Sequence, residues 1–149
     1  MKRIVFAFAL AIALSGVGFA FAQDKCTVSG EVVYSGNSNI YIYLHNSTSW
    51  TAFATRQKEL PAPEFVQIVK VTGSGKVSFA FNEVPKGEYV IQAFADETAN
   101  AKMDCDLEGY AIEPRAFFKP RPHHGLYVNW HEQKFMVDKD ATGIILKLH

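Results

Sequence analysis

The chain has 149 residues, with 15 lysines and arginines against 15 aspartates and glutamates, so its formal net charge is zero at pH 7. The basic residues form no cluster, so the sequence gives no electrostatic support for a nucleic-acid partner. The length suits one domain with a hydrophobic core of its own.

The first 22 residues predict a secretory signal peptide. Two basic residues at positions 2 and 3, an unbroken apolar run over 4–14 and the sequence Ala-Phe-Ala at 20–22 form the usual cleavage pattern. We expect a signal peptide over 1–22 and a single domain over 23–149, exported to the periplasm or out of the cell. A membrane anchor is the alternative, but serine and glycine dilute the apolar run. No second apolar span follows, so no membrane span is expected after cleavage.

Alternation of apolar and polar residues with period two predicts an all-β domain. The expected strands cover 26–34, 39–45, 65–71, 76–81, 88–95, 127–137 and 144–148. One short helix is expected over 50–60, with Ser49 as its N-cap. About seven short strands with this spacing predict an antiparallel immunoglobulin-like β-sandwich. Long connections over 46–64 and 96–125 are where a sheet scaffold tends to carry function.

The connection that begins at Asp96 carries the most informative chemical pattern. Oxygen side chains recur at every second position, which is the spacing of a loop that wraps a hard cation such as calcium. The predicted calcium ligands are Asp96, Thr98, Asn100, the carbonyl of Lys102, Asp104 and Asp106. Ala101 stands where such a loop bends sharply and normally has glycine. The alternative is a solvated turn in which aspartate and asparagine side chains bond to their own backbone.

The strand over 39–45 predicts a second candidate site. Tyr41 and Tyr43 share one face with Asn39 and His45. Aromatic rings with polar edges can hold a sugar or another flat ligand, so Tyr41 and Tyr43 are the predicted ligand-binding residues. The alternative is aromatic packing between strands beneath a loop.

Cys26 and Cys105 are the two cysteines of the chain. An exported protein meets an oxidising environment, so we expect a disulfide bond between them. This bond would close a loop of about 80 residues, worth about 4–5 kcal/mol in the chain-entropy model. The alternative is two free thiols too far apart to bond.

An ordered set of motifs resembles a known bacterial family. The sequence Val84-Pro85-Lys86-Gly87-Glu88-Tyr89 precedes Phe94-Ala95-Asp96-Glu97, and Gly109, Glu113, Trp130 and Phe135 follow. In this order they resemble the exported family catalogued as domain of unknown function 2141, and the hairpin alone resembles carboxypeptidase-regulatory-like and transthyretin-like sandwiches. The resemblance covers roughly 32–148 and implies export and a sandwich fold, with no established activity. Ala99 and Ala101 replace glycines that are usual in the family's aspartate-rich loop.

No catalytic motif is visible in the sequence. No serine lies in a Gly-x-Ser-x-Gly elbow, and neither cysteine has a recognised nucleophile context. We therefore expect a non-enzymatic exported module of the cell envelope that binds an envelope protein or a glycan, with an acidic loop that holds calcium. The alternative is a purely structural or protein-interaction domain, in which the loop and the disulfide bond serve stability.

Overall fold

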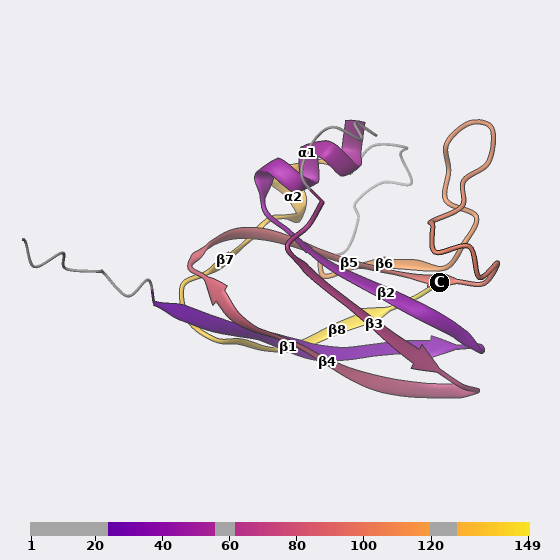
Figure 1. Cartoon of the computed structure of the whole chain (residues 1–149), viewed down its shortest axis with the longest axis horizontal. Coiled ribbons are helices and arrows are strands. Elements are labelled where there is room, and N and C mark those ends of the chain that lie inside the picture. Colours follow the sequence, from indigo (N-terminus) through magenta and orange to yellow (C-terminus); the bar gives the residue numbers. More distant parts are fainter. Residues whose placement is uncertain (1–23, 56–61, 120–127) are drawn as a thin grey trace, which may run out of the picture.

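The computed structural model describes residues 24–55, 62–119 and 128–149, which form two packed β-sheets with two short helices (Figure 1). The expected signal peptide lies outside the described residues. The elements in chain order are β1 (Lys25–Ser35), β2 (Ser38–His45), α1 (Ser47–Thr55), β3 (Phe65–Val71), β4 (Ser74–Pro85), β5 (Gly87–Asp96), β6 (Arg115–Phe117), α2 (Trp130–Gln133), β7 (Phe135–Val137) and β8 (Ala141–Lys147). Neither helix in this described part is long and apolar enough to cross a bilayer.

The strands form one three-stranded and one five-stranded sheet. The first has the order β4-β1-β8, and the second has the order β3-β2-β5-β6 with β7 also paired to β5. The predicted β-sandwich is confirmed, with eight strands in the described residues instead of about seven. One pairing differs in direction, because β8 runs parallel to β1 while the other pairs are antiparallel.

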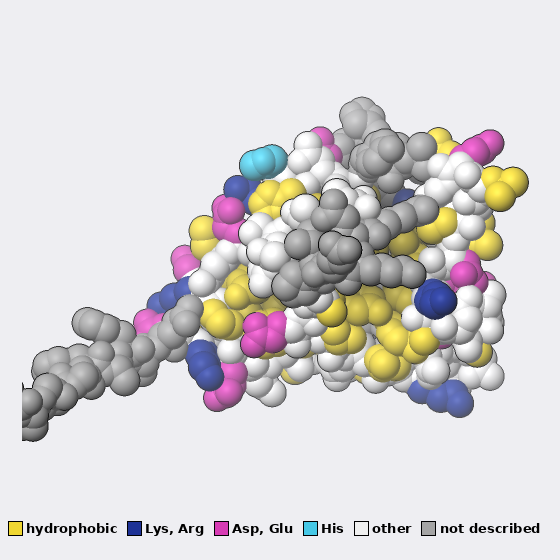
Figure 2. Space-filling view, turned by 45° about the horizontal axis from the view of Figure 1, so that its top comes forward, with side chains coloured by type: hydrophobic (Ala, Val, Ile, Leu, Met, Phe, Trp, Pro, Cys, Tyr) yellow, Lys and Arg dark blue, Asp and Glu magenta, His cyan; other side chains and the backbone are white. Residues whose placement is uncertain are grey.

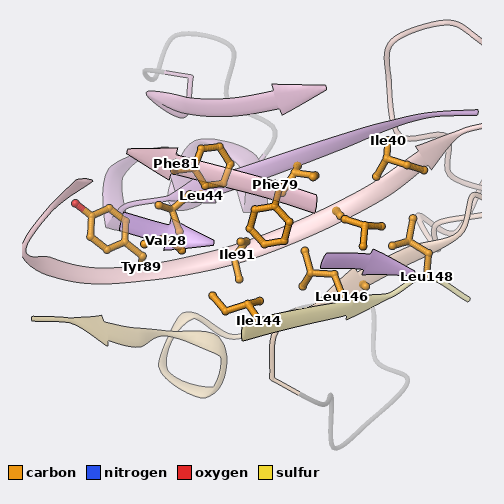
Figure 3. Close-up of a cluster of buried hydrophobic side chains, with 14 of the residues drawn as sticks. Val28, Ile40, Leu44, Phe79, Phe81, Tyr89, Ile91, Ile144, Leu146 and Leu148 are labelled. Carbon is orange, nitrogen blue, oxygen red and sulfur yellow. The ribbon is translucent and has the colours of Figure 1, made fainter. Parts of the chain in front are cut away.

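The core lies between the two sheets and follows from period-two alternation (Figure 3). On β2, Ile40, Ile42 and Leu44 point inward and are at most 1% exposed. The facing sheet supplies Val28, Phe79, Phe81, Ile144 and Leu146. Since β2 and β5 each bury one face in this core, their other face is left for the helices and for solvent.

Two local predictions were wrong for the same reason, an asparagine cap. Asn129 Oδ1 accepts from His131 N at 2.9 Å and begins α2, so only Phe135–Val137 of the predicted strand over 127–137 is a strand. Likewise, Asn46 Oδ1 accepts from Ser49 N at 2.9 Å, so α1 begins three residues before the predicted helix start. Ser49 is buried inside the first turn of α1 instead of capping it.

The five-stranded sheet carries both candidate sites. Helices α1 and α2 cover part of its outer face, and the rest of that face is one site. The loop over 97–114 between β5 and β6, called the acidic loop below, projects from one end of the sandwich (Figure 1). The short strand β6, which the sequence analysis missed, ties the end of this loop back to β5. Both candidate sites therefore rest on β5 and its neighbours.

Candidate functional site

Asp96 closes the first turn of the acidic loop. It ends β5, its side chain is buried, and its two oxygens accept from Asn100 N at 3.0 Å and Ala101 N at 2.9 Å. Donors on both oxygens make this carboxylate the acceptor of a main-chain turn, as aspartate commonly is.

Asp104 closes the same turn from its other side. Its oxygens accept from Asn100 Nδ2 at 2.9 Å and from Thr98 Oγ1 at 2.9 Å. The hydrogen bond from the Asn100 side chain, followed by that from Thr98, lowers the pKa of Asp104 below its ordinary value. Thus four of the predicted ligands, Asp96, Thr98, Asn100 and Asp104, lie together, joined by hydrogen bonds.

The remaining two predicted ligands lie differently. Asp106 Oδ1 accepts from Glu108 N at 3.0 Å and Tyr110 N at 2.8 Å, which closes a second, separate turn. Lys102 donates its N–H to Asn100 Oδ1 at 2.8 Å. Within the described part of the chain, no group of three or more histidine, cysteine, aspartate and glutamate side chains is placed to hold a metal ion.

Glu113 is the residue that organises the loop. Its buried carboxylate accepts from Glu97 N at 2.9 Å and Thr98 N at 3.3 Å through Oε1, and from Asp104 N at 3.0 Å through Oε2. It therefore joins both ends of the turn to the start of β6. The ordered family motif includes Glu113, but the sequence does not show which groups it binds, because the partners lie 9 to 16 residues away in an irregular segment.

The same turn contains two alanines in the left-handed region. Ala99 has φ 58° and Ala101 has φ 60°, a conformation that glycine adopts without a steric penalty. Replacing either alanine by glycine should raise the free energy of unfolding by up to about 1 kcal/mol, since the relieved strain exceeds the added chain entropy. Urea unfolding measures this effect. Ala80→Gly in β4, where φ is not positive, is the control and should lower stability; the same loss at Ala101 would contradict the prediction.

The outer face of the five-stranded sheet carries the second candidate site. Tyr41 stacks on Phe94 at 5.1 Å between ring centroids and 8° between planes, and Tyr43 stacks on Phe94 at 6.1 Å and 12°. Both tyrosines are half-buried, while Val66 and Ile68 beside them on β3 are 44% and 55% exposed. Figure 2 shows hydrophobic side chains gathered on the side of the molecule that carries this face. The structure thus brings Tyr41 and Tyr43 together on one apolar surface.

At the helix end of this face, His45 is enclosed by aromatic rings. Its ring centroid lies 5.7 Å from those of Tyr43 and Trp50 and 5.4 Å from that of Phe53, and the residue is 2% exposed. The Gln92 amide nitrogen lies 3.0 Å from Nε2 and donates to it, which puts the ring proton on Nδ1. Nδ1 has no hydrogen-bond partner. Burial lowers the pKa of His45 to about 4, and the Ser49 backbone acts in the opposite direction with a smaller effect.

This histidine should make stability fall in mild acid. Its folded pKa lies below the unfolded value of about 6.5, so the unfolded chain takes up a proton first as the pH drops. We expect the free energy of unfolding to fall by roughly 3 kcal/mol between pH 6.5 and pH 4 on this account. Thermal melting across this range should show the loss, and His45→Gln should lack it. An NMR titration of the ring with a midpoint near 6.5 would contradict the prediction.

The predicted disulfide bond between Cys26 and Cys105 is absent, and both thiols are free. Cys26 lies at the start of β1, whereas Tyr34 at its end contacts the acidic loop through Glu97 at 2.6 Å. Cys105 belongs to that loop, so the two cysteines are at opposite ends of a strand that spans about 26 Å between positions 26 and 34. A disulfide bond requires Cα atoms within about 7 Å.

Comparison with protein families assigns the chain. The family described as "Uncharacterized protein conserved in bacteria (DUF2141)" matches residues 27–144. The chain belongs to this family. The search of curated proteins and the search of solved structures found no match.

The DUF2141 match runs from β1 into β8, so it includes the acidic loop and the outer sheet face that carries Tyr41 and Tyr43. The resemblance seen in the sequence is thereby confirmed. The description of DUF2141 names bacteria as its source and gives no activity.

Proposed function

We propose that this DUF2141 protein is an exported, non-enzymatic binding module of the cell envelope. Export rests on the basic, apolar and small-residue pattern of its first 22 residues. Binding rests on one observation, the stacked rings of Tyr41, Tyr43 and Phe94 on the outer face of the five-stranded sheet. The sheet and the Phe94 ring, which is 4% exposed, hold the two half-buried tyrosine rings in place, so little conformational entropy is lost when a ligand covers the tyrosines.

The chemistry of the face favours a flat ligand with apolar faces and polar edges, and a glycan has this character. Tyr41 and Tyr43 offer half-buried rings with hydroxyl groups at their edges. In the next row of the sheet, Lys70, Asn39 and Asp96 are paired side by side across β3, β2 and β5. Exposed Lys70 and Asn39 provide hydrogen-bonding groups beside the rings.

The experiment is a glycan array followed by titration of the best-bound glycan. Tyr41→Ala and Tyr43→Ala should each weaken its binding at least tenfold, because each removes an aromatic contact surface. Tyr110→Ala is the matched control, since Tyr110 is 40% exposed on the acidic loop and should leave binding unchanged. An array without a hit, or binding unaffected by both substitutions, would overturn the proposal.

For the acidic loop we propose a metal-free, hydrogen-bonded turn in place of a calcium site. Main-chain N–H groups point at both oxygens of Asp96 and at both oxygens of Glu113, and a cation at these positions would face those donors. We expect the same melting temperature in millimolar calcium and in excess chelator. An upward shift with calcium that Asp104→Ala abolishes would restore the calcium interpretation.

A further inference from the structure

We propose that two copies of this protein associate through the free edge of β3, in an antiparallel pairing centred on Gln67. β3 is the terminal strand of the five-stranded sheet, and among the described residues no strand pairs with it on the side away from β2. This association is independent of the proposed glycan binding.

The edge of β3 lacks the features that usually prevent strands from associating. Its pairing with β2 is continuous from Phe65 to Val71 without a bulge, and the strand contains no proline. Lys70, near its end, is its single charged residue. Val66 and Ile68 are 44% and 55% exposed on its outer face. A long, regular and apolar edge of this kind is a template for another strand.

The adjacent edge strand of the other sheet is different. Ala80 N of β4 donates to Gln67 Oε1 at 3.0 Å, so a side chain from β3 occupies a main-chain donor of β4. β3 therefore partly blocks the neighbouring edge, while no strand of the described ranges occupies its own edge.

The sequence of this edge is complementary to itself, which favours a second copy as the partner. In an antiparallel pairing centred on Gln67, Val66 of each copy lies opposite Ile68 of the other copy. The two-fold axis therefore gives two such apolar pairs in the dimer. Glu64, which is exposed just before β3, then lies opposite exposed Lys70 of the other copy. All four of these residues are on the outer face, because alternate residues of a strand share a face. Each apolar and each opposite-charge pair stabilises the strand pairing.

Sedimentation velocity over a wide range of concentration, on the chain isolated after export, tests the proposal. We expect a dimer that dissociates on dilution. Ile68→Lys should raise its dissociation constant about 100-fold, because the dimer contains the altered pair twice and each loss costs about tenfold. The matched control is Ile145→Lys on β8, which should leave the dimer intact, because Ile145 is 50% exposed against 55% for Ile68 but lies on an edge of the other sheet.

A charge exchange separates pairing of β3 from a general effect on stability. Lys70→Glu should weaken the dimer by placing glutamate opposite Glu64 of the partner copy, and adding Glu64→Lys should restore it. A monomer at every concentration would overturn the proposal. So would a dimer that Ile145→Lys disrupts as strongly as Ile68→Lys, or one that the double exchange fails to restore.

Discussion

Replacing Glu113 by alanine is expected to lower the free energy of unfolding by about 3 kcal/mol and the melting temperature by about 10 °C. Its buried carboxylate accepts main-chain N–H groups of Glu97, Thr98 and Asp104. Removing it leaves these donors without their acceptor, and hydrogen bonds to a charged group contribute about 1.5–3 kcal/mol each. We expect less than the full sum, because the loop is near solvent and can relax toward water.

A graded series makes this prediction specific to the acceptor atoms. Glu113→Gln keeps the size of the side chain but replaces one acceptor oxygen by a donor, so it should lose about half as much stability. Glu108→Ala removes an exposed glutamate from the same loop and should change stability by less than about 0.5 kcal/mol. Amide exchange should show lost protection at residues 97, 98 and 104. Equal stability of the Glu113→Ala and Glu108→Ala variants would show that the carboxylate does not organise the loop.

The strands could be predicted because burial of one sheet face imposes a period of two on the sequence. In β2, Ile40, Ile42 and Leu44 alternate with polar and aromatic residues, and all three enter the core as expected. The predictions failed where a side chain acts on nearby backbone. Asn46 and Asn129 each cap a helix, and their short side chains leave no periodic trace in the sequence.

The sequence also does not show which distant segments pair with each other, and the reason is different. The alternation in β8 shows which side is buried, but it does not show whether the strand beside it runs parallel or antiparallel. The parallel pairing of β8 with β1 therefore appears first in the structure. Both thiols are likewise free in the structure, since the number of cysteines in a sequence carries no information about the length of β1 that separates Cys26 from the loop of Cys105.

The acidic loop shows how one spacing can serve two chemistries. Oxygen side chains at alternate positions suit a calcium ion, and they equally suit a turn whose N–H groups need acceptors. Glu113, which accepts main-chain N–H groups of the loop, lies outside the repeating pattern and is brought to the loop by the pairing of β6 with β5. By contrast, Tyr41 and Tyr43 could be placed on one face from the sequence, because they belong to a regular strand.

Gly30 leaves no room for a side chain, and Gly30→Ala is expected to lower the free energy of unfolding by about 3 kcal/mol or more. A Cβ atom at this position would lie 1.9 Å from the carbonyl oxygen of Ile144 and 2.7 Å from its carbonyl carbon. These are main-chain atoms of β8, and β1 holds β8 by pairing on both sides of this contact, so relief requires the strands to separate. Separation would expose Ile144 and Leu146, which are buried in the core.

Gly75→Ala provides the matched control for this substitution. Gly75 lies in β4 beside the end of β1, and an added Cβ atom would meet no atom within 4 Å. Gly75→Ala should change the free energy of unfolding by no more than about 0.5–1 kcal/mol. An increase is expected if the main effect is the lower conformational entropy of the unfolded chain. Urea unfolding compares the two variants, and circular dichroism with limited proteolysis reports the case in which Gly30→Ala does not fold. Equal stability of the Gly30→Ala and Gly75→Ala proteins would contradict this prediction. It would mean that β8 is held less closely against β1 than the parallel pairing requires, because only a looser β8 leaves room for the added methyl group.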